Sequence, residues 1–180
     1  MQENVSKKIV HELLDYLKMI VFVLVFVLII NNFVIVNALI PSESMENTIM
    51  TDDRIFGNRL AYLFGEPKRG DVVIFKFPDD ERQLFIKRVI GLPGDKVNII
   101  DGKVYINDSA TPLDEPYLPE PMNGNYGPYT VPEGEYFMLG DNRNRSKDSR
   151  FWVNTFVKKD QIEGEAAFRY FPFNQMGTIK

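Results

Sequence analysis

The N-terminal part of the chain is dominated by one long apolar run. Residues 19–40 carry no charged side chain, and roughly 20 apolar residues are enough for a helix to cross a bilayer. Three asparagines weaken the second half of the run, because an unpaired amide in hydrocarbon is costly, and this favours a start nearer Leu13. The pattern predicts a transmembrane anchor over 19–40 behind a short segment, 1–18.

Two other interpretations of this run are weaker. Val36 and Ala38 have the small-residue spacing of a cleavable secretory signal. A buried core helix would normally show a polar stripe along one side, and this run has none. We therefore favour a retained anchor.

After residue 40 the pattern changes to short β-rich runs separated by Gly, Pro and Asp, which is typical of an all-β domain. This texture continues to the end of the chain, so 41–180 is predicted to be one folded domain of ordinary size. The predicted strands are 71–77, 84–90, 136–139 and 165–171.

A hairpin is the clearest local signal in this domain. Residues 97–100 and 103–106 flank Asp101 and Gly102, a pair that favours a two-residue type I′ turn. The stretch that follows, 107–132, is rich in Pro, Gly and Asn, which predicts an irregular extension instead of more sheet.

Charge suggests how the chain is oriented. Lys7, Lys8 and Lys18 precede the apolar run, and by the positive-inside rule they place the N-terminus in the cytoplasm and the β domain outside the membrane. The net charge of -4 and a pI of about 5.1 argue against a nucleic-acid partner, because phosphate binding needs clustered Lys and Arg in excess.

The composition also restricts the chemistry. Cysteine is absent, which removes thiol nucleophiles and thiolate zinc sites. The single histidine, His11, lies beside the apolar run, so the folded domain cannot hold a Ser-His-Asp triad within one chain. If the chain performs nucleophilic hydrolysis, its base must be Lys, a carboxylate or the N-terminal amine.

A serine and a lysine stand out as candidates. Ser44 lies just beyond the apolar run, and Lys87 lies in an apolar strand, where burial can lower a lysine pKa enough to make it a base. Strand alternation places Lys87 among apolar residues on one face of the strand, but it places Arg88 among apolar residues on the other face as well. Ser42 is as plausible as Ser44, so spacing alone leaves both choices open.

Three segments, in order, resemble the signature boxes of the bacterial type I signal peptidases. Residues 42–48 are similar to the box around the family's nucleophile, residues 87–95 match its lysine box throughout, and residues 140–150 are similar to its Gly-Asp-Asn box. Residues 69–73 add a weaker match. The resemblance covers nearly the whole chain and includes the membrane segment before the first box.

The resemblance implies a fold and a set of roles. The fold would be mostly β, with a coiled antiparallel sheet core and one N-terminal transmembrane helix. Ser44 would be the nucleophile and Lys87 the general base. The Ser44 N–H and the Ser42 hydroxyl would form the oxyanion hole. Ser146 would orient the lysine, and Asp148 and Arg150 would form a supporting ion pair.

The implied function is removal of signal peptides from secretory preproteins at the outer face of a cell membrane, with an apolar surface resting on the lipid. No metal or other cofactor is implied. The alternative is a non-catalytic, membrane-anchored accessory of surface-protein (pilin-like) assembly that has the same fold. β-Lactam-binding enzymes are disfavoured because no Ser is followed three residues later by Lys, and a self-cleaving repressor is disfavoured by the membrane segment.

Two positions depart from the family pattern. Asn47 stands where the family usually has Pro, and Val153 stands where Gly is more typical. Replacing proline frees the backbone φ and restores an N–H donor in the turn after Ser44. We expect activity to be retained and the geometry of this turn to differ.

Overall fold

The computed structural model describes residues 2–63 and 65–179, with side chains from residue 11 onward. It begins with helix α1 (Gln2–Ile29), which continues through one π-helical turn, η1 (Ile30–Val34), into strand β1 (Ile35–Leu39). The predicted anchor of 19–40 is therefore too long at its end. Residues 35–39, apolar except for Asn37, belong to a sheet and not to the helix, a distinction that hydropathy alone does not make.

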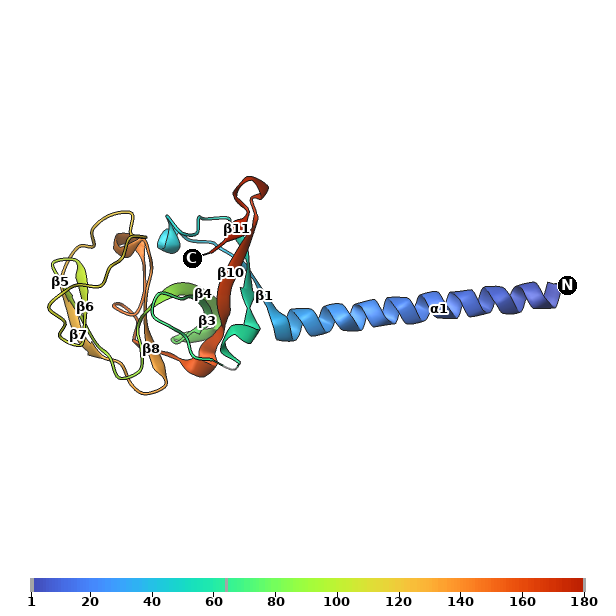
Figure 1. Cartoon of the computed structure of the whole chain (residues 1–180), viewed down its shortest axis with the longest axis horizontal. Coiled ribbons are helices and arrows are strands. Elements are labelled where there is room, and N and C mark those ends of the chain that lie inside the picture. The colour runs from blue at the N-terminus through green and yellow to red at the C-terminus, as the bar shows by residue number, and fades with distance from the viewer. Residues whose placement is uncertain (1, 64, 180) are drawn as a thin grey trace.

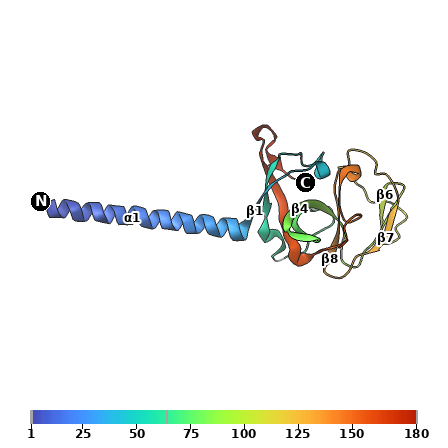
Figure 2. The same cartoon turned by 180° about the vertical axis from the view of Figure 1, so that it is seen from behind.

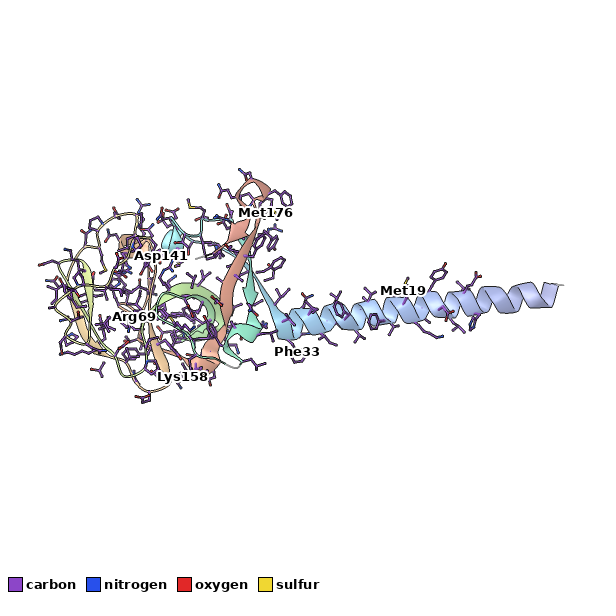
Figure 3. All side chains as sticks on the ribbon, viewed as in Figure 1. Met19, Phe33, Arg69, Asp141, Lys158 and Met176 are labelled. Atoms are coloured by element: carbon purple, nitrogen blue, oxygen red, sulfur yellow. The ribbon has the colours of Figure 1, made fainter. Side chains whose placement is uncertain are left out.

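The helix is long and apolar enough to cross a membrane. Residues 11–34 have a mean hydropathy of 2.7, and none of this stretch is buried against the rest of the molecule. Figure 1 shows α1 projecting from the β domain as a single rod. In Figure 3 the side chains along it, such as Met19, point outward without touching the domain. The side chains of Lys7 and Lys8, on which the predicted orientation depends, lie outside those described.

Two antiparallel sheets make up the rest of the molecule. The larger has eight strands in the order β1-β2-β10-β3-β4-β8-β9, with β11 paired to β10, and the smaller has the order β6-β5-β7. The structure therefore confirms the mostly β fold with one N-terminal helix. The remaining strands of the large sheet are β2 (Arg54–Asn58), β3 (Val72–Phe77), β4 (Asp80–Gly91), β8 (Glu135–Leu139), β9 (Val157–Lys158), β10 (Ile162–Phe171) and β11 (Gly177–Thr178). Short 3-10 turns occur at Glu43–Met45, Arg59–Tyr62, Arg143–Arg145, Lys159–Gln161 and Phe173–Gln175.

The β3–β4 hairpin forms the centre of the large sheet. β3 is a nearly continuous apolar run, and the second half of β4, from Ile86 to Gly91, is buried with it, whereas the first half of β4 is largely polar and exposed. Ile74 faces Ile86 across the pair and packs into one core cluster. Phe75 packs with Val89 and Trp152 into a second cluster. Successive residues of β3 and β4 therefore serve two cores, one on each side.

The smaller sheet confirms one sequence prediction and corrects another. Strands β5 (Lys96–Ile100) and β6 (Lys103–Ile106) form the predicted hairpin, with positive φ at Asp101 and Gly102, as a type I′ turn requires. The interpretation of 107–132 as irregular is wrong at its end, because β7 (Tyr126–Thr130) pairs with the second edge of β5. The Gly and Pro residues of β7 are unfavourable in strands, so the sequence did not predict this strand, which is stabilised by its pairing with β5.

The two sheets lie at different distances from the helix. In Figure 1 the three-stranded sheet is at the end of the molecule opposite α1, and β1 and β10 are next to the helix. Figure 2, from behind, shows the same order. The central β3–β4 hairpin and the segment that follows β1 lie between these ends. Ser42 and Ser44 lie in that segment after β1, and Lys87 lies in β4.

Candidate active site

Ser44 is held in a tight turn directly after β1. It lies in the 3-10 turn η2 (Glu43–Met45) and is 5% exposed. The backbone N–H of Asn142 donates to the Ser44 carbonyl at 3.1 Å. A Cβ on Gly140 would stand 2.4 Å from the same carbonyl oxygen, so only glycine permits this approach. The Gly-Asp-Asn segment therefore fixes the Ser44 backbone from behind.

Lys87 reaches Ser44 from β4. Its Nζ donates to Ser44 Oγ at 2.6 Å and to the Ile86 carbonyl at 2.8 Å, and it lies 5.6 Å from the centre of the Phe85 ring. The side chain is almost fully buried, with 4% of its surface exposed. The two residues are 43 positions apart in the sequence, and the fold brings their reactive atoms into direct contact.

Burial makes this amine a usable base. Removal from water lowers the pKa of Lys87 to about 8, although the carboxylates of Asp148 and Asp141 act in the opposite direction. A lysine with such a pKa is neutral in a large fraction of molecules at mildly alkaline pH. A neutral amine at this distance can accept the proton of the Ser44 hydroxyl.

Two other predicted hydroxyl groups lie close to this pair. Ser42 Oγ is 3.3 Å from Ser44 Oγ. Ser146 Oγ is buried and has no hydrogen-bond partner within the described part of the chain. The expected bond from Ser146 to the lysine is therefore not formed; the partners of Lys87 Nζ are Ser44 Oγ and the Ile86 carbonyl. A Cβ on Gly140 would stand 2.3 Å from Ser146 Oγ, which places this hydroxyl beside the Ser44 turn.

Asp148 and Arg150 form an ion pair beneath the site. Arg150 Nε donates to Asp148 Oδ1 at 2.8 Å, and its Nη2 donates to Oδ2 at 2.9 Å. Both side chains are buried, at 1% and 0% exposure. Asp148 also accepts the Gly140 N–H. The pair thus holds the backbone of the segment that supports Ser44.

A second buried ion pair ties the lysine strand to the nucleophile turn. Arg88 donates to both oxygens of Asp141, at 2.9 and 2.6 Å. Thr48 Oγ1 donates to Asp141 Oδ2 at 2.5 Å, and the Tyr117 ring lies 3.9 Å from the Arg88 guanidinium. Lys87 and Arg88 therefore point to opposite sides of β4: Lys87 contacts Ser44, and Arg88 pairs with Asp141. Strand alternation alone could not show which of the two faces the serine.

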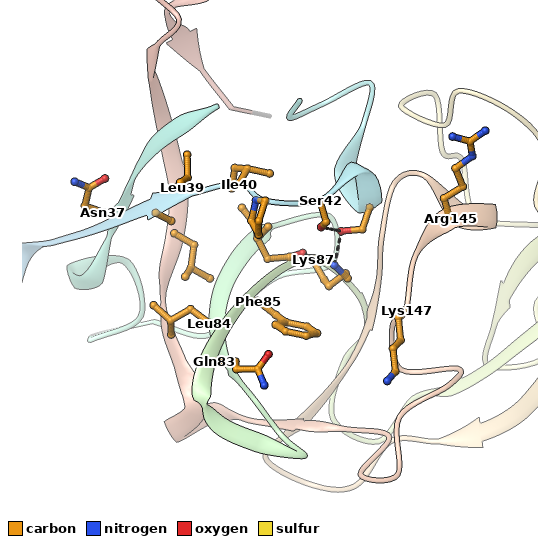
Figure 4. A pocket seen from close by; sticks show the side chains of 15 residues that line it. Asn37, Leu39, Ile40, Ser42, Gln83, Leu84, Phe85, Lys87, Arg145 and Lys147 are labelled. Carbon is orange, nitrogen blue, oxygen red and sulfur yellow. Dashed lines mark hydrogen bonds between the residues drawn. The ribbon is translucent and has the colours of Figure 1, made fainter. Parts of the chain in front are cut away.

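An elongated groove of about 500 Å3 leads to Ser44 and Lys87. One side is formed by the end of β1, up to Leu39, with Ile40 and Pro41 after it, and another by residues 83–87 of β4. Figure 4 shows Leu39 and Leu84 at one end of the groove, with Lys87 and Ser42 farther along it. The walls at this end are mainly apolar. An extended peptide can lie in this space with its carbonyl next to Ser44 Oγ.

The chain is similar to known peptidases over most of its length. Residues 13–171 match the family described as signal peptidase, peptidase S26. The chain belongs to this family of signal peptidases. A signal peptidase I of Leptolyngbya laminosa is 39% identical over 174 residues, covering 93% of this chain and 84% of that protein. Signal peptidase I S of Bacillus subtilis (strain 168) is 38% identical over 185 residues, covering 97% and 96%.

A solved structure is also similar. The crystal structure of a signal peptidase I from Enterococcus faecalis V583 is 38% identical in sequence to this chain. It has a TM-score of 0.48 and covers 56% of this chain and 96% of that one. Membership of the S26 family makes this chain a serine peptidase and does not favour the non-catalytic assembly accessory.

The structure gives a physical reason for one departure of this peptidase from the family pattern. Asn47 has a φ of 84°, in the left-handed region that proline cannot enter. Its Nδ2 donates to the Tyr117 carbonyl at 2.7 Å. Val153, by contrast, does not have a positive φ and is 89% exposed, so nothing at this position requires glycine. Asn47 thus links the nucleophile turn to the extension around Tyr117.

Several supporting residues of this peptidase had no predicted role. Four of them lie inside the signature boxes, which indicated a role but not the residues that they contact: Thr48, Arg88, Asp141 and Asn142. Glu115 forms a buried ion pair with Arg143, yet it lies in the extension, where no motif marks it. Its role depends entirely on tertiary contact.

Proposed function

We propose that this signal peptidase removes signal peptides from secretory preproteins by attack of Ser44, with Lys87 as the general base. The observation that carries the proposal is the contact of 2.6 Å between the buried Lys87 Nζ and Ser44 Oγ. A serine needs a neighbouring base to become a nucleophile. The low pKa of Lys87, about 8, suits this role.

The reaction proceeds in two steps. Lys87 Nζ takes the Ser44 proton while Oγ bonds to the scissile carbonyl carbon; the C–N bond then breaks, and Lys87 returns the proton to the departing amine. Water next gives a proton to Lys87 Nζ as it attacks the ester carbon; the bond from that carbon to Ser44 Oγ then breaks, Lys87 returns the proton to Oγ, and the cut signal peptide leaves with a new carboxylate. The Ser44 N–H and Ser42 Oγ stabilise the negative oxygen in both steps. The unpartnered Ser146 hydroxyl can hold the Lys87 amine once Ser44 is acylated.

The substrate binds as an added strand. Among the residues that the structure describes, β1 pairs with β2 alone, and residues 80–87 of β4 pair only with β3, because β8 begins its pairing at Arg88. Both free edges border the groove, where the backbone of an extended peptide can satisfy them. The apolar walls and the limited volume favour small side chains before the cleaved bond.

The membrane arrangement extends this proposal. The helix crosses the bilayer once, with residues 1–18 in the cytoplasm and the catalytic β domain, 41–180, outside. Exposed apolar side chains near the helix rest on lipid. They include Phe56, Phe171, Phe173 and Met176, and Figure 3 shows Met176 at the tip of the β10–β11 region beyond the body of the domain.

Cleavage of a model preprotein by the full-length wild type, two dyad variants and two control variants tests the proposed dyad. Ser44→Ala and Lys87→Ala should each abolish cleavage while circular dichroism shows the fold retained. Ser109→Ala and Lys76→Ala, which remove a serine and a strand lysine outside the site, should cleave like the wild type. Cleavage that survives either Ser44→Ala or Lys87→Ala refutes the mechanism.

A further inference from the structure

The groove has a charged wall opposite its apolar one. Arg145 and Lys147, from the segment between β8 and β9, line it together with the residues of β1 and β4. Figure 4 shows both cations on the far side of Lys87 from Leu39 and Leu84. None of the described residues that line this groove is Asp or Glu. One end of the groove is therefore apolar, and the end beyond the dyad is positively charged.

The cationic side chains between β8 and β9 differ in whether they form ion pairs. Arg143 is buried against Glu115, and the exposed Arg145 forms an ion pair with Glu43 at 2.9 Å. The Lys147 ammonium makes neither a hydrogen bond nor an ion pair within 11–63 and 65–179, and at longer range it acts on the carboxylate of Asp79. The chain as a whole carries a net charge of -4. A positive groove wall is thus a local feature of an acidic protein.

The geometry points to a subsite, formed by Lys147 with Arg145, for an acidic side chain in the first residues after the scissile bond. This inference rests on the proposed function. Residues before the cut occupy the apolar end between the free edges of β1 and β4, and Ser44 Oγ marks the cleaved carbonyl. The chain that leaves as the amine must then continue past Lys87 toward the positive wall.

The expected effect is moderate because Lys147 is exposed. Ion pairs in water contribute little each, so exchanging Glu for Lys at the contacted position should change kcat/KM by about three- to tenfold in favour of Glu. The preference should shrink in about 0.5 M salt, where the Debye length is only a few ångströms. Apolar selection at the other end of the groove should not respond to salt in this way.

A charge-exchange experiment tests the subsite in the full-length protein in detergent. Model preproteins carrying Glu, Gln or Lys at each of the first three positions after the cut are cleaved by the wild type, Lys147→Gln and Lys147→Glu. We expect the wild type to prefer Glu at one or more positions, Lys147→Gln to lose most of that preference, and Lys147→Glu to reverse it. Arg145→Gln should weaken the preference less, because Glu43 already neutralises that charge.

Lys103→Glu is the matched control, since it changes the net charge equally on β6, outside the groove. It should keep the wild-type order of substrates. If Lys147→Glu cleaves the Glu, Gln and Lys substrates in the wild-type ratio, the subsite is refuted while the dyad stands. If the wild type cleaves none of them, or Ser44→Ala cleaves them, the proposed function itself fails.

Discussion

At the scale of single residues, Lys87 differs from the buried arginines around it. Arg88, Arg143 and Arg150 each face a carboxylate, whereas Lys87 Nζ faces a hydroxyl and a carbonyl. A buried cation without a counter-ion is costly, and lysine can relieve that cost by losing its proton, which arginine cannot do. The guanidinium groups around the site thus stay charged and form structural ion pairs, whereas the Lys87 amine can lose its proton.

The pH dependence of cleavage follows from this difference. Below the Lys87 pKa of about 8 the amine is protonated and cannot accept the Ser44 proton, so kcat/KM should fall about tenfold per pH unit. Above that pH it should reach a plateau. A pH profile of kcat/KM on a model preprotein measures the midpoint. An acid limb centred between pH 4 and 6.5 would indicate a carboxylate or a histidine as the base instead.

Asn47 allows a prediction about the turn that follows Ser44. Asn47→Pro cannot keep a φ of 84° and loses the bond to the Tyr117 carbonyl, so both activity and melting temperature should fall. Asn47→Gly tolerates this φ and loses only the amide contact, worth roughly 1 kcal/mol, so it should lie between Asn47→Pro and the wild type. Thermal unfolding and cleavage rates of the two variants check this order. An Asn47→Pro variant equal to the wild type would contradict it.

At the scale of elements, β1 is a strand attached directly to a helix that is long and apolar enough to cross a membrane. The π-helical turn after α1 ends at Val34 and the strand begins at Ile35, so no loop separates the apolar helix from the strand that borders the groove. Val36 is 3% exposed and packs in the same core cluster as Ile55. Cleavage after Ala38, the alternative left by the small-residue spacing, would remove this strand from the sheet.

The contribution of β1 can be measured by truncation. A variant lacking residues 1–34 should keep the β domain folded, because it removes only the helix and its π-helical turn. A variant lacking residues 1–40 also loses Val36 and Ile40, two buried side chains worth about 2 kcal/mol each, and should unfold several degrees lower or fail to fold. Thermal unfolding by circular dichroism compares the two. Equal melting temperatures would show that β1 does not stabilise the domain.

At the scale of the whole molecule, the helix and the apolar tip of β10–β11 place the groove close to a surface that lipid would cover. A signal peptide that leaves the bilayer would then meet the free edges of β1 and β4 without crossing much water. The small sheet at the opposite end lies away from this surface (Figure 2). The substrate and the enzyme can thus share one membrane.

The absence of cysteine offers a direct test of the proposed orientation. Single cysteines introduced as Gln2→Cys and Ser109→Cys should react with a membrane-impermeant maleimide from opposite sides. In intact cells only Ser109→Cys should be labelled, and Gln2→Cys should be labelled after the membrane is opened. Each variant must still cleave a preprotein, which serves as the control for folding. The reverse pattern would overturn the assignment of residues 1–18 to the cytoplasm.

Much of the fold could be predicted from local pattern. The strands at 71–77 and 84–90, the type I′ hairpin and the N-terminal helix were visible because their periodicity and turn residues are set by neighbours in the chain. β1 and β7 were missed because their own sequences do not indicate a strand. The sequence of β1 is indistinguishable from that of a membrane helix, and β7, with its Gly and Pro, is stabilised by pairing with β5.

The sequence by itself determined the class of chemistry: without cysteine, and with its one histidine beside the membrane run, the chain had only amines and carboxylates to activate a serine. The family resemblance named Ser44 and Lys87, but only the tertiary structure shows that their reactive atoms meet. The contact between Lys87 and Ser44, the different task of Arg88, the position of Ser146 and the charged wall at Lys147 all depend on atoms far apart in the chain. Such contacts are set by how strands pair and which face is buried, and a linear pattern does not contain that information.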